Sequence, residues 1–266
     1  MKLGIISGSG LYDFEGVAAV EETEVTPFGS VAVAVGALGR HDVVWISRHG
    51  PGHRRLSNHV THRANIQAMR ARNVQAIVGV TAVGVIDPSL PLARPIVFDD
   101  VFFPSNRLPE GDLATYFLRP GDPLRGHWIP DRPFSPWLCG YLARAAADAG
   151  TPAVVGGCYV HADGPRFNTA AEHRWMRSVG GTAVSQTCGP EAVLAGELGL
   201  PYALVGFGVN HVTGIEGAGT EGDAGLEGLL ARLRSSMVAL VRALADVLPV
   251  DVEVPCEMGG VFRMGS

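Results

Sequence analysis

Chemistry suited to holding an anion follows the first apolar run of the chain. Residues 3–6 are apolar, and residues 7–10 then have the sequence SGSG, with Ser9 as a hydroxyl donor. Glycine lets a ligand approach the backbone, and the N–H groups and hydroxyls of such a turn can bind phosphate. The dinucleotide fingerprint and the P-loop are both absent, because Asp13 replaces the third glycine and no Gly-Lys-Ser/Thr occurs. An anion site and a plain strand-to-loop turn both remain open interpretations.

A second apolar run, residues 43–46, leads into the basic segment 47–55, SRHGPGHRR. Arginine is the preferred bidentate partner of phosphate, and histidine can donate a second charge-assisted bond, which makes Arg48 and His49 candidate anion ligands. A solvated basic loop is the simpler alternative. Four histidines lie close together here, namely His49, His53, His59 and His62. We expect no metal site, because neighbouring arginines would repel a cation and no carboxylate or thiol is interleaved.

Two later segments also follow an apolar run and carry a hydroxyl that could bind an anion. Residues 79–84, GVTAVG, end a buried run in small residues with a hydroxyl, at Thr81 and Ala82. Residues 186–191, QTCGPE, follow another apolar run, and Thr187 could donate to an anion. Small residues where a strand ends in a sheet commonly admit a ligand, although close packing of a strand against a helix explains them equally well.

Two segments could recognise a planar ring. Residues 163–169, DGPRFNT, present Phe167 and Asn168 ahead of a helix that a capping box of Thr169 and Glu172 would begin. Phe167 could offer a face to a heterocycle, and a core phenylalanine is the simpler alternative. In residues 208–214, GVNHVTG, Asn210 could read the polar edge of a ring.

Composition narrows the function class. The 266 residues are 47% hydrophobic and 18% charged, with a net charge of −5. This balance gives no electrostatic case for nucleic acid or an anionic membrane as the main partner. Four scattered cysteines without a CxxC pair are typical of free thiols in a reducing compartment. With neither a signal peptide nor an apolar run of about 18 residues, we expect a cytoplasmic protein without membrane association.

Short apolar runs alternate with helical patterns along the whole chain, which predicts an α/β fold. The predicted strands are residues 3–6, 31–35, 43–46, 76–80, 95–98, 153–155, 183–184 and 202–209. Most are apolar at consecutive positions, which suits strands covered on both faces. The predicted helices are residues 65–72, 136–149, 170–179, 190–198 and 225–248. No linker divides the chain, so residues 1–266 are expected to form one domain, with residues 104–136 as a functional or interface loop.

Taken together, these segments resemble the trimeric purine nucleoside phosphorylases, most closely the 5′-methylthioadenosine phosphorylase branch. The stretches that carry the resemblance are GIISGSGL, SRHGPGH with NHVTHRANI, VTAVG, DGPRFNTAAE, SQTCGPEAVLAGELGLPYA and GVNHVTG. They extend from Gly4 to about Gly217. The resemblance implies a single α/β domain with a central twisted, mixed and partly barrel-like sheet flanked by helices. It also implies a homotrimer, in which residues 104–136 are our candidate for completing a neighbouring subunit's pocket.

The resemblance assigns roles to particular residues. Phosphate is expected to be held by Ser9, Arg48, His49, Thr81, Ala82 and Thr187. The purine is expected near Phe167, Asn168, Asn210 and Val212, and the ribose near Gln186, His59 and His62. Phosphate would attack the ribose carbon while the base leaves, with catalysis by positioning and electrostatic stabilisation through Asn210, Arg48 and His49. Inorganic phosphate is the implied co-substrate, and no metal or organic cofactor is expected.

The identity of the base depends on Asn210 and Val212. Adenine-specific relatives have aspartate at both positions, whereas an asparagine amide can accept from purine N7–H and donate to O6. This favours inosine, guanosine or 5′-methylthioinosine over adenine nucleosides, with a 5′-methylthioadenosine phosphorylase as the alternative. Asn168 replaces the usual glutamate, and Gln186 replaces a methionine under the ribose. A nucleoside hydrolase and a weakly active nucleoside-binding protein are further alternatives.

Overall fold

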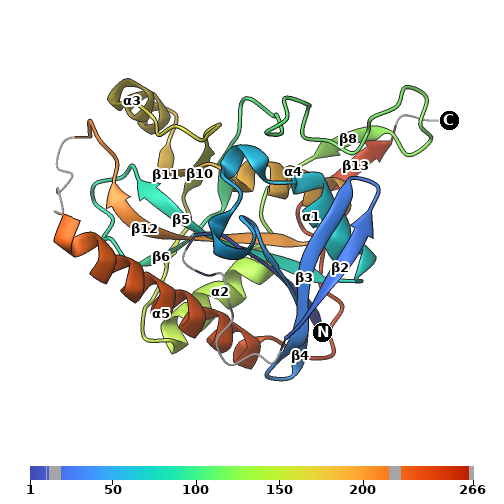
Figure 1. Cartoon of the computed structure of the whole chain (residues 1–266), viewed down its shortest axis with the longest axis horizontal. Helices are drawn as coiled ribbons and strands as arrows, with labels where there is room; N and C mark the ends of the chain where they lie inside the picture. Colours follow the sequence, from blue (N-terminus) through green and yellow to red (C-terminus); the bar gives the residue numbers. More distant parts are fainter. Residues whose placement is uncertain (10, 12–18, 216–222, 264–266) are drawn as a thin grey trace.

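A branched β-sheet with helices on both faces forms the centre of the protein (Figure 1). The structure, a computed structural model, describes residues 1–9, 11, 19–215 and 223–263. Within these residues an 11-stranded sheet contains β1 (Lys2–Ser7), β2 (Val20–Thr26), β3 (Gly29–Leu38), β4 (His41–Ser47), β5 (Ala76–Val85), β6 (Pro95–Val97), β7 (Asp100–Phe102), β9 (Val154–Val155), β10 (Cys158–His161), β11 (Gly181–Ser185) and β12 (Tyr202–His211). Strands β8 (Gly126–Ile129) and β13 (Gly260–Arg263) pair separately.

The branch of the sheet lies at β5. The order β2-β3-β4-β1-β5-β11-β10-β7 runs across the sheet, and β12 also pairs with β5 and carries β6 and β9. The first half of β5 lies between β1 and β12, whereas its last residues, Gly84 and Val85, pair with β11 and β12. This change of partner makes the sheet branched and mixed, and a large mixed sheet flanked by helices confirms the predicted α/β architecture.

The register of the parallel strands brings three loops to one level. Ser7 at the end of β1 is paired with Ser47 at the end of β4 and with Val80 in β5. The residues that follow each of these positions therefore meet at one edge of the sheet, where parallel strands commonly place a ligand. Residues 8–9, 48–49 and 81–82 are the ones brought together.

Two pairs of helices bury the two faces of the sheet. Helices α2 (Pro136–Asp148) and α5 (Asp223–Val247) cover one face, with Leu138, Leu142, Met237, Leu240 and Leu244 packed against Ile5, Val78 and Val205. Helices α1 (His62–Ala71) and α4 (Cys188–Glu197) cover the other, with Ile66, Met69, Ala192 and Leu194 packed against Ile6, Ile46 and Leu204. Helix α3 (Ala170–Ser178) covers the end of the sheet near β10 and β11.

The predicted helices all occur, and Thr169 and Glu172 form the predicted capping box of α3. The strand predictions were incomplete: β2, β7, β8, β10 and β13 were not predicted, and β3 differs from the prediction in its burial. The charged strand β2 (VEETEVT) was not predicted, because this edge strand faces water along most of its length and carries no apolar signal. Strand β3 alternates buried and exposed residues, so it is not covered on both faces. No helix in the described part of the chain is long and apolar enough to cross a membrane.

Candidate active site

Arg48 is fully buried at the end of β4, and most of its N–H groups donate to acceptors within the protein. Its Nε donates to Glu191 Oε1 at 2.5 Å and its Nη2 to Glu191 Oε2 at 2.9 Å. Nη1 donates to the carbonyl of Val80 and Nη2 also to that of Ile6, both at 3.2 Å. A guanidinium has five N–H groups, so one remains, on Nη1. The predicted bidentate pair with phosphate is therefore wrong in geometry: Glu191 takes the bidentate position, because a buried cation requires a counter-ion.

Gly8 lies directly against the remaining N–H group of Arg48. A Cβ placed on Gly8 would come within 2.6 Å of Arg48 Nη1 and 3.7 Å of Thr81 Oγ1. The backbone N–H of Gly8 donates to the carbonyl of Val80 at 3.0 Å, which holds the turn against β5. A ligand above Gly8 can thus reach donors from β4 and β5 together. Gly10, the second glycine of the predicted anion turn, lies outside the described residues.

Replacing Gly8 with alanine is expected to weaken phosphate binding by roughly tenfold or more, because the new methyl would occupy the approach to Arg48 Nη1. Isothermal titration with inorganic phosphate measures this effect. Gly140→Ala is the matched control, since nothing lies within 4 Å of the added Cβ in helix α2. Unchanged phosphate affinity in the Gly8 variant would show that this approach is not used.

Thr187 begins α4, but its hydroxyl does not cap the helix. The phenol oxygen of Tyr159 accepts from the backbone N–H groups of Thr187 and Cys188, at 3.4 and 3.1 Å, and His161 Nδ1 accepts from that of Gly189 at 3.3 Å. A helix N-terminus normally needs its first side chain for this purpose. Because Tyr159 and His161 satisfy these donors, the Thr187 hydroxyl is not needed as a cap; it contacts Cys188 Sγ at 3.6 Å, a weak partner that a ligand oxygen could replace.

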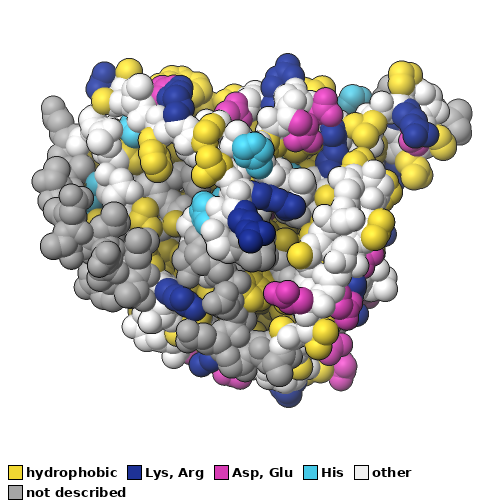
Figure 2. Space-filling view, in the orientation of Figure 1, with side chains coloured by type: hydrophobic (Ala, Val, Ile, Leu, Met, Phe, Trp, Pro, Cys, Tyr) yellow, Lys and Arg dark blue, Asp and Glu magenta, His cyan; other side chains and the backbone are white. Residues whose placement is uncertain are grey.

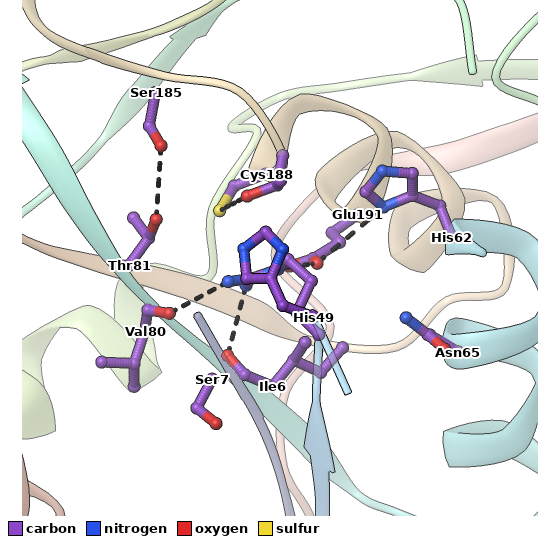
Figure 3. Close-up of polar contacts among 12 residues, drawn as sticks. Ile6, Ser7, His49, His62, Asn65, Val80, Thr81, Ser185, Cys188 and Glu191 are labelled. Atoms are coloured by element: carbon purple, nitrogen blue, oxygen red, sulfur yellow. Dashed lines mark hydrogen bonds and ion pairs between the residues drawn. The ribbon is translucent and has the colours of Figure 1, made fainter. Parts of the chain in front are cut away.

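The side chain of Thr81 connects β5 with the end of β11. Its Oγ1 lies 3.4 Å from Ser185 Oγ, and Figure 3 shows the two hydroxyls facing each other. Ser185 is two residues before Thr187, so this contact places the loop that carries Thr187 beside Thr81 and the loops that follow β1 and β4. Arg48, which follows β4, contacts Glu191 in the first turn of α4, the helix that Thr187 begins. The structure thus brings together the segments that carry Arg48, Thr81 and Thr187.

His49 is buried and lies next to this site (Figure 3). Its Nδ1 donates to the carbonyl of Arg55 at 2.8 Å, since a carbonyl can only accept. Burial, and then the positive charge of Arg48, lower the pKa of His49 to about 4. His49 is therefore neutral at pH 7 and presents an acceptor at Nε2, so the predicted charge-assisted donor is wrong for the free protein.

Glu191 was not recognised from the sequence as part of the site. Its carboxylate is fully buried and accepts from Arg48 and from the hydroxyl of Tyr202 at 2.8 Å. An acidic residue in the first turn of a helix usually faces solvent and interacts with the helix dipole, so nothing in the local sequence indicates an internal ion pair. The signal in the sequence is Arg48 itself: a buried arginine at the end of a strand needs an internal carboxylate as counter-ion.

His62, a predicted ribose residue, lies beside Glu191. It is the first residue of α1, its side chain is buried, and its Nδ1 faces Glu191 Oε1 at 3.9 Å (Figure 3). Neither ring nitrogen has a hydrogen-bond partner. Helix α1 turns this ring toward α4, to the Glu191 side of Arg48, so its role as a ribose contact stays a prediction. His59, the other predicted ribose residue, is exposed.

Asn210 lies at the end of β12, on the far side of β5 from β1. It is exposed and pairs with Gly84, after a bulge that shifts the register between Gly208 and Asn210. Its Nδ2 donates to the carbonyl of His211 at 3.0 Å, which leaves Oδ1 and one N–H for a ligand. Because Thr81 pairs with Gly206, Asn210 lies about 10 Å farther along the sheet than the phosphate ligands.

Val212 does not face the same space as Asn210. It is buried in a small apolar cluster with Ile86, Val160, Met176 and Val184, below α3. The chain leaves β12 after His211 and turns this side chain into the core, so Val212 as a base contact stays a prediction.

The loop between β10 and α3 carries the predicted base residues Phe167 and Asn168. The Phe167 side chain is 90% exposed, so it is not the core residue that the simpler interpretation expected. Asn168 is half-buried, and its Nδ2 donates to Glu172 at 3.5 Å. Helix α3, which follows, is held beside the end of β12 by a 2.9 Å contact between His173 Nδ1 and the Thr213 carbonyl.

The surface above this edge of the sheet is basic. Figure 2 shows arginine and histidine side chains gathered near the middle of this face, over the turns between β4 and α1. Those turns include Arg54 and His59, which are exposed. A positive surface at the entrance favours approach of an anion even though the whole chain carries a net negative charge. Among the described residues, no group of three His, Cys, Asp or Glu side chains is arranged to hold a metal.

Acidification below pH 6.5 is expected to lower the free energy of unfolding. Burial lowers the pKa of His41, His49, His62 and His161 in the folded protein. At pH values between the unfolded pKa of 6.5 and the lower folded pKa values, the unfolded chain binds more protons than the folded one. The free energy of unfolding therefore decreases as the pH is lowered, by up to about 1.4 kcal/mol per unit of pKa difference for each group. Urea denaturation at pH 7 and pH 5 measures this. His62→Phe should show a smaller loss, and exposed His59→Phe an unchanged one; equal stability at both pH values would contradict the account.

Comparison with known proteins shows the family and the fold of the chain. Residues 2–248 match the phosphorylase superfamily. The chain is 32% identical to a 6-oxopurine nucleoside phosphorylase of Pyrococcus furiosus, over 96% of both chains. It is 37% identical to an S-methyl-5′-thioadenosine phosphorylase of Mycobacterium tuberculosis, over 83% of this chain and 78% of the relative. A crystal structure of a methylthioadenosine phosphorylase from an antarctic soil metagenomic library superimposes with a TM-score of 0.80 and 26% identity, covering 92% of this chain and 85% of that one.

Proposed function

The chain belongs to the phosphorylase superfamily, and we propose that it cleaves 6-oxopurine nucleosides, such as inosine, guanosine or 5′-methylthioinosine, with inorganic phosphate. The relatives named above are phosphorylases of purine nucleosides, and this chain is an enzyme of that type. The observation that carries the proposal is the meeting of Arg48, Thr81 and Thr187 at one edge of the sheet, beside an exposed asparagine at the end of β12.

Phosphate is proposed to bind above Gly8. Arg48 Nη1 and the hydroxyls of Thr81 and Thr187 would donate to its oxygens, together with donors from Ser9 and the backbone of Ala82. Neutral His49 would accept a hydrogen bond from a protonated phosphate oxygen through Nε2. Because the charge of Arg48 is balanced by Glu191, most of the binding would come from oriented neutral donors, and the role of the site is to place the nucleophile beneath the ribose carbon.

Asn210 is proposed to read the base. Its remaining N–H would donate to O6 of the nucleoside, and its amide oxygen would accept from N7–H of the released base, in which N7 carries a proton. As the bond to the sugar breaks, negative charge grows on the purine, and a donor at O6 stabilises this charge. The distance of about 10 Å along β5 between Thr81 and Asn210 leaves room for a ribose between phosphate and base. Phe167 and Asn168 would then close the base side of the pocket.

A 5′-methylthioadenosine phosphorylase is the second candidate, because relatives of that name match the chain over most of its length. Release of free base from inosine, guanosine, 5′-methylthioinosine and 5′-methylthioadenosine, each with and without phosphate, separates the candidates. We expect release to require phosphate and to be fastest with a 6-oxopurine nucleoside. Faster release of adenine would favour the second candidate, and release independent of phosphate would indicate a hydrolase.

A homotrimer is proposed for the assembled enzyme. Residues 104–136 carry the exposed apolar side chains Leu113, Leu118 and Leu124, which a partner subunit could cover. Light scattering coupled to gel filtration should give the mass of three chains, and the mass of one chain would contradict the proposal.

A further inference from the structure

Gln186 uses both ends of its side chain to connect two parts of the site. Its Oε1 accepts from Ser57 Oγ at 2.8 Å, and its Nε2 donates to the carbonyl of Arg166 at 2.8 Å. Ser57 begins the 3₁₀ turn η2 (Ser57–His59), in the segment that leads from Arg48 to α1. Arg166 belongs to the loop that presents Phe167. Gln186 itself stands between the two, directly before Thr187.

Gly164 fits closely over this bridge. A Cβ on Gly164 would overlap both Ser57 Oγ and Gln186 Oε1. The backbone of the loop that precedes α3 is therefore pressed onto the hydrogen bond between these two side chains. Only glycine permits so close an approach at this position, and the contact fixes how far the loop stands from the phosphate side.

The loop has few other ties to the rest of the site. Phe167 is 90% exposed, so its side chain does not anchor the loop. The ion pair of Arg166 with Glu172, and the bond from Asn168 to Glu172, hold the loop only to its own helix α3. Among the described residues, Asp163 anchors the beginning of the loop to Ser105 at 3.2 Å. Among the described residues, the side-chain hydrogen bonds that tie the segment beyond Asp163 to the phosphate side of the site are therefore those of Gln186.

The phosphate side does not depend on Gln186 in the same way. Arg48 is held by Glu191 and two backbone carbonyls, and the backbone of Thr187 is held by the hydroxyl of Tyr159. Both sets of contacts are buried and would persist if Gln186 were shortened or lost its polar ends. Removing the bridge should thus loosen one side of the site and leave the other in place.

We propose that Gln186 is a positioning residue that holds the base-side loop, residues 164–168, against the phosphate side of the site through Ser57 and the Arg166 carbonyl. The inference rests on the proposed function only for naming the two sides as base and phosphate. It gives Gln186 a role other than ribose contact.

Gln186→Met tests the proposal, because methionine keeps the length of the side chain and loses both hydrogen bonds. Calorimetric titration with hypoxanthine and, separately, with inorganic phosphate needs no turnover. We expect hypoxanthine binding about tenfold weaker and phosphate binding within about threefold of the wild type. Gln186→Glu should lose as much affinity for hypoxanthine as Gln186→Met, since its carboxylate accepts from Ser57 but cannot donate to the Arg166 carbonyl. Adding Ser57→Ala to Gln186→Met should cause no further loss, because the two side chains act as one bridge.

Gln75→Met is the matched control. It also loses a bond to the backbone, from the N–H of Lys2 at 2.8 Å, but at the opposite end of the sheet, and should bind both ligands normally. Unchanged hypoxanthine affinity in Gln186→Met, or an equal loss for phosphate, would overturn the proposal. A wild-type protein that binds hypoxanthine but releases none from inosine and phosphate would refute the proposed function and leave this inference standing. A wild-type protein that binds no hypoxanthine would overturn both.

Discussion

Replacing Arg48 with alanine is expected both to weaken the use of phosphate and to destabilise the fold. The loss of the single Nη1 donor removes a charge-assisted bond, which should raise the KM for phosphate by roughly 10- to 100-fold. The same change leaves the carboxylate of Glu191 buried without its counter-ion, which costs about 3–5 kcal/mol of stability. Steady-state kinetics with varied phosphate, together with urea denaturation, measure the two effects.

A double variant separates these effects. Arg48→Met combined with Glu191→Gln removes both charges, and the glutamine can still accept from the Tyr202 hydroxyl. Much of the lost stability should return, because no unpaired buried charge remains. The defect with phosphate should persist. If the double variant, or a folded Arg48→Ala protein, used phosphate as well as the wild type, Arg48 would be a structural residue only.

Replacing Asn210 with aspartate is expected to move the base preference toward 6-aminopurines. A carboxylate only accepts, so it loses the donor for O6 and gains an acceptor for an exocyclic amine; when protonated it can donate to N7. The variant loses the partner of O6 in inosine and gains a partner for the amine in adenosine. The ratio of kcat/KM for inosine over adenosine should therefore fall by roughly 100-fold. Measuring this ratio in both proteins tests the assignment.

Asn73→Asp serves as the control for this exchange. Asn73 follows α1 at the other end of the sheet, where its backbone N–H donates to the carbonyl of Arg70. The same change of charge there should leave the ratio unaltered. An inosine-to-adenosine ratio that stays constant in Asn210→Asp would mean that another residue reads the 6-position of the purine.

The sequence was sufficient to predict which loops meet. Apolar runs mark buried strands, and hydroxyl, basic or small residues follow several of them. Since parallel strands end at the same edge of a sheet, Ser9, Arg48 and Thr81 could be expected to converge, and the register of β1, β4 and β5 places them together. The beginning of α3 was also predictable, because a capping box is a local pattern of Thr169 and Glu172.

The partners of these residues could not be predicted. Arg48 and Glu191 are 143 residues apart in the chain, and their pairing depends on how α4 approaches the end of β4. The direction of a side chain at the end of an element is equally non-local. Val212 turns into the core and His62 turns toward Glu191 because of the neighbours that the fold supplies, and the pattern around each residue carries no sign of this.

A crystal structure of the protein with inorganic phosphate tests the central claim most directly. The account predicts one anion above Gly8, within hydrogen-bonding distance of Arg48 Nη1, Thr81 Oγ1 and Thr187 Oγ1, with Glu191 still paired to Arg48. An anion bound only at the exposed arginines between β4 and α1, or this position left without an anion at saturating phosphate, would contradict it.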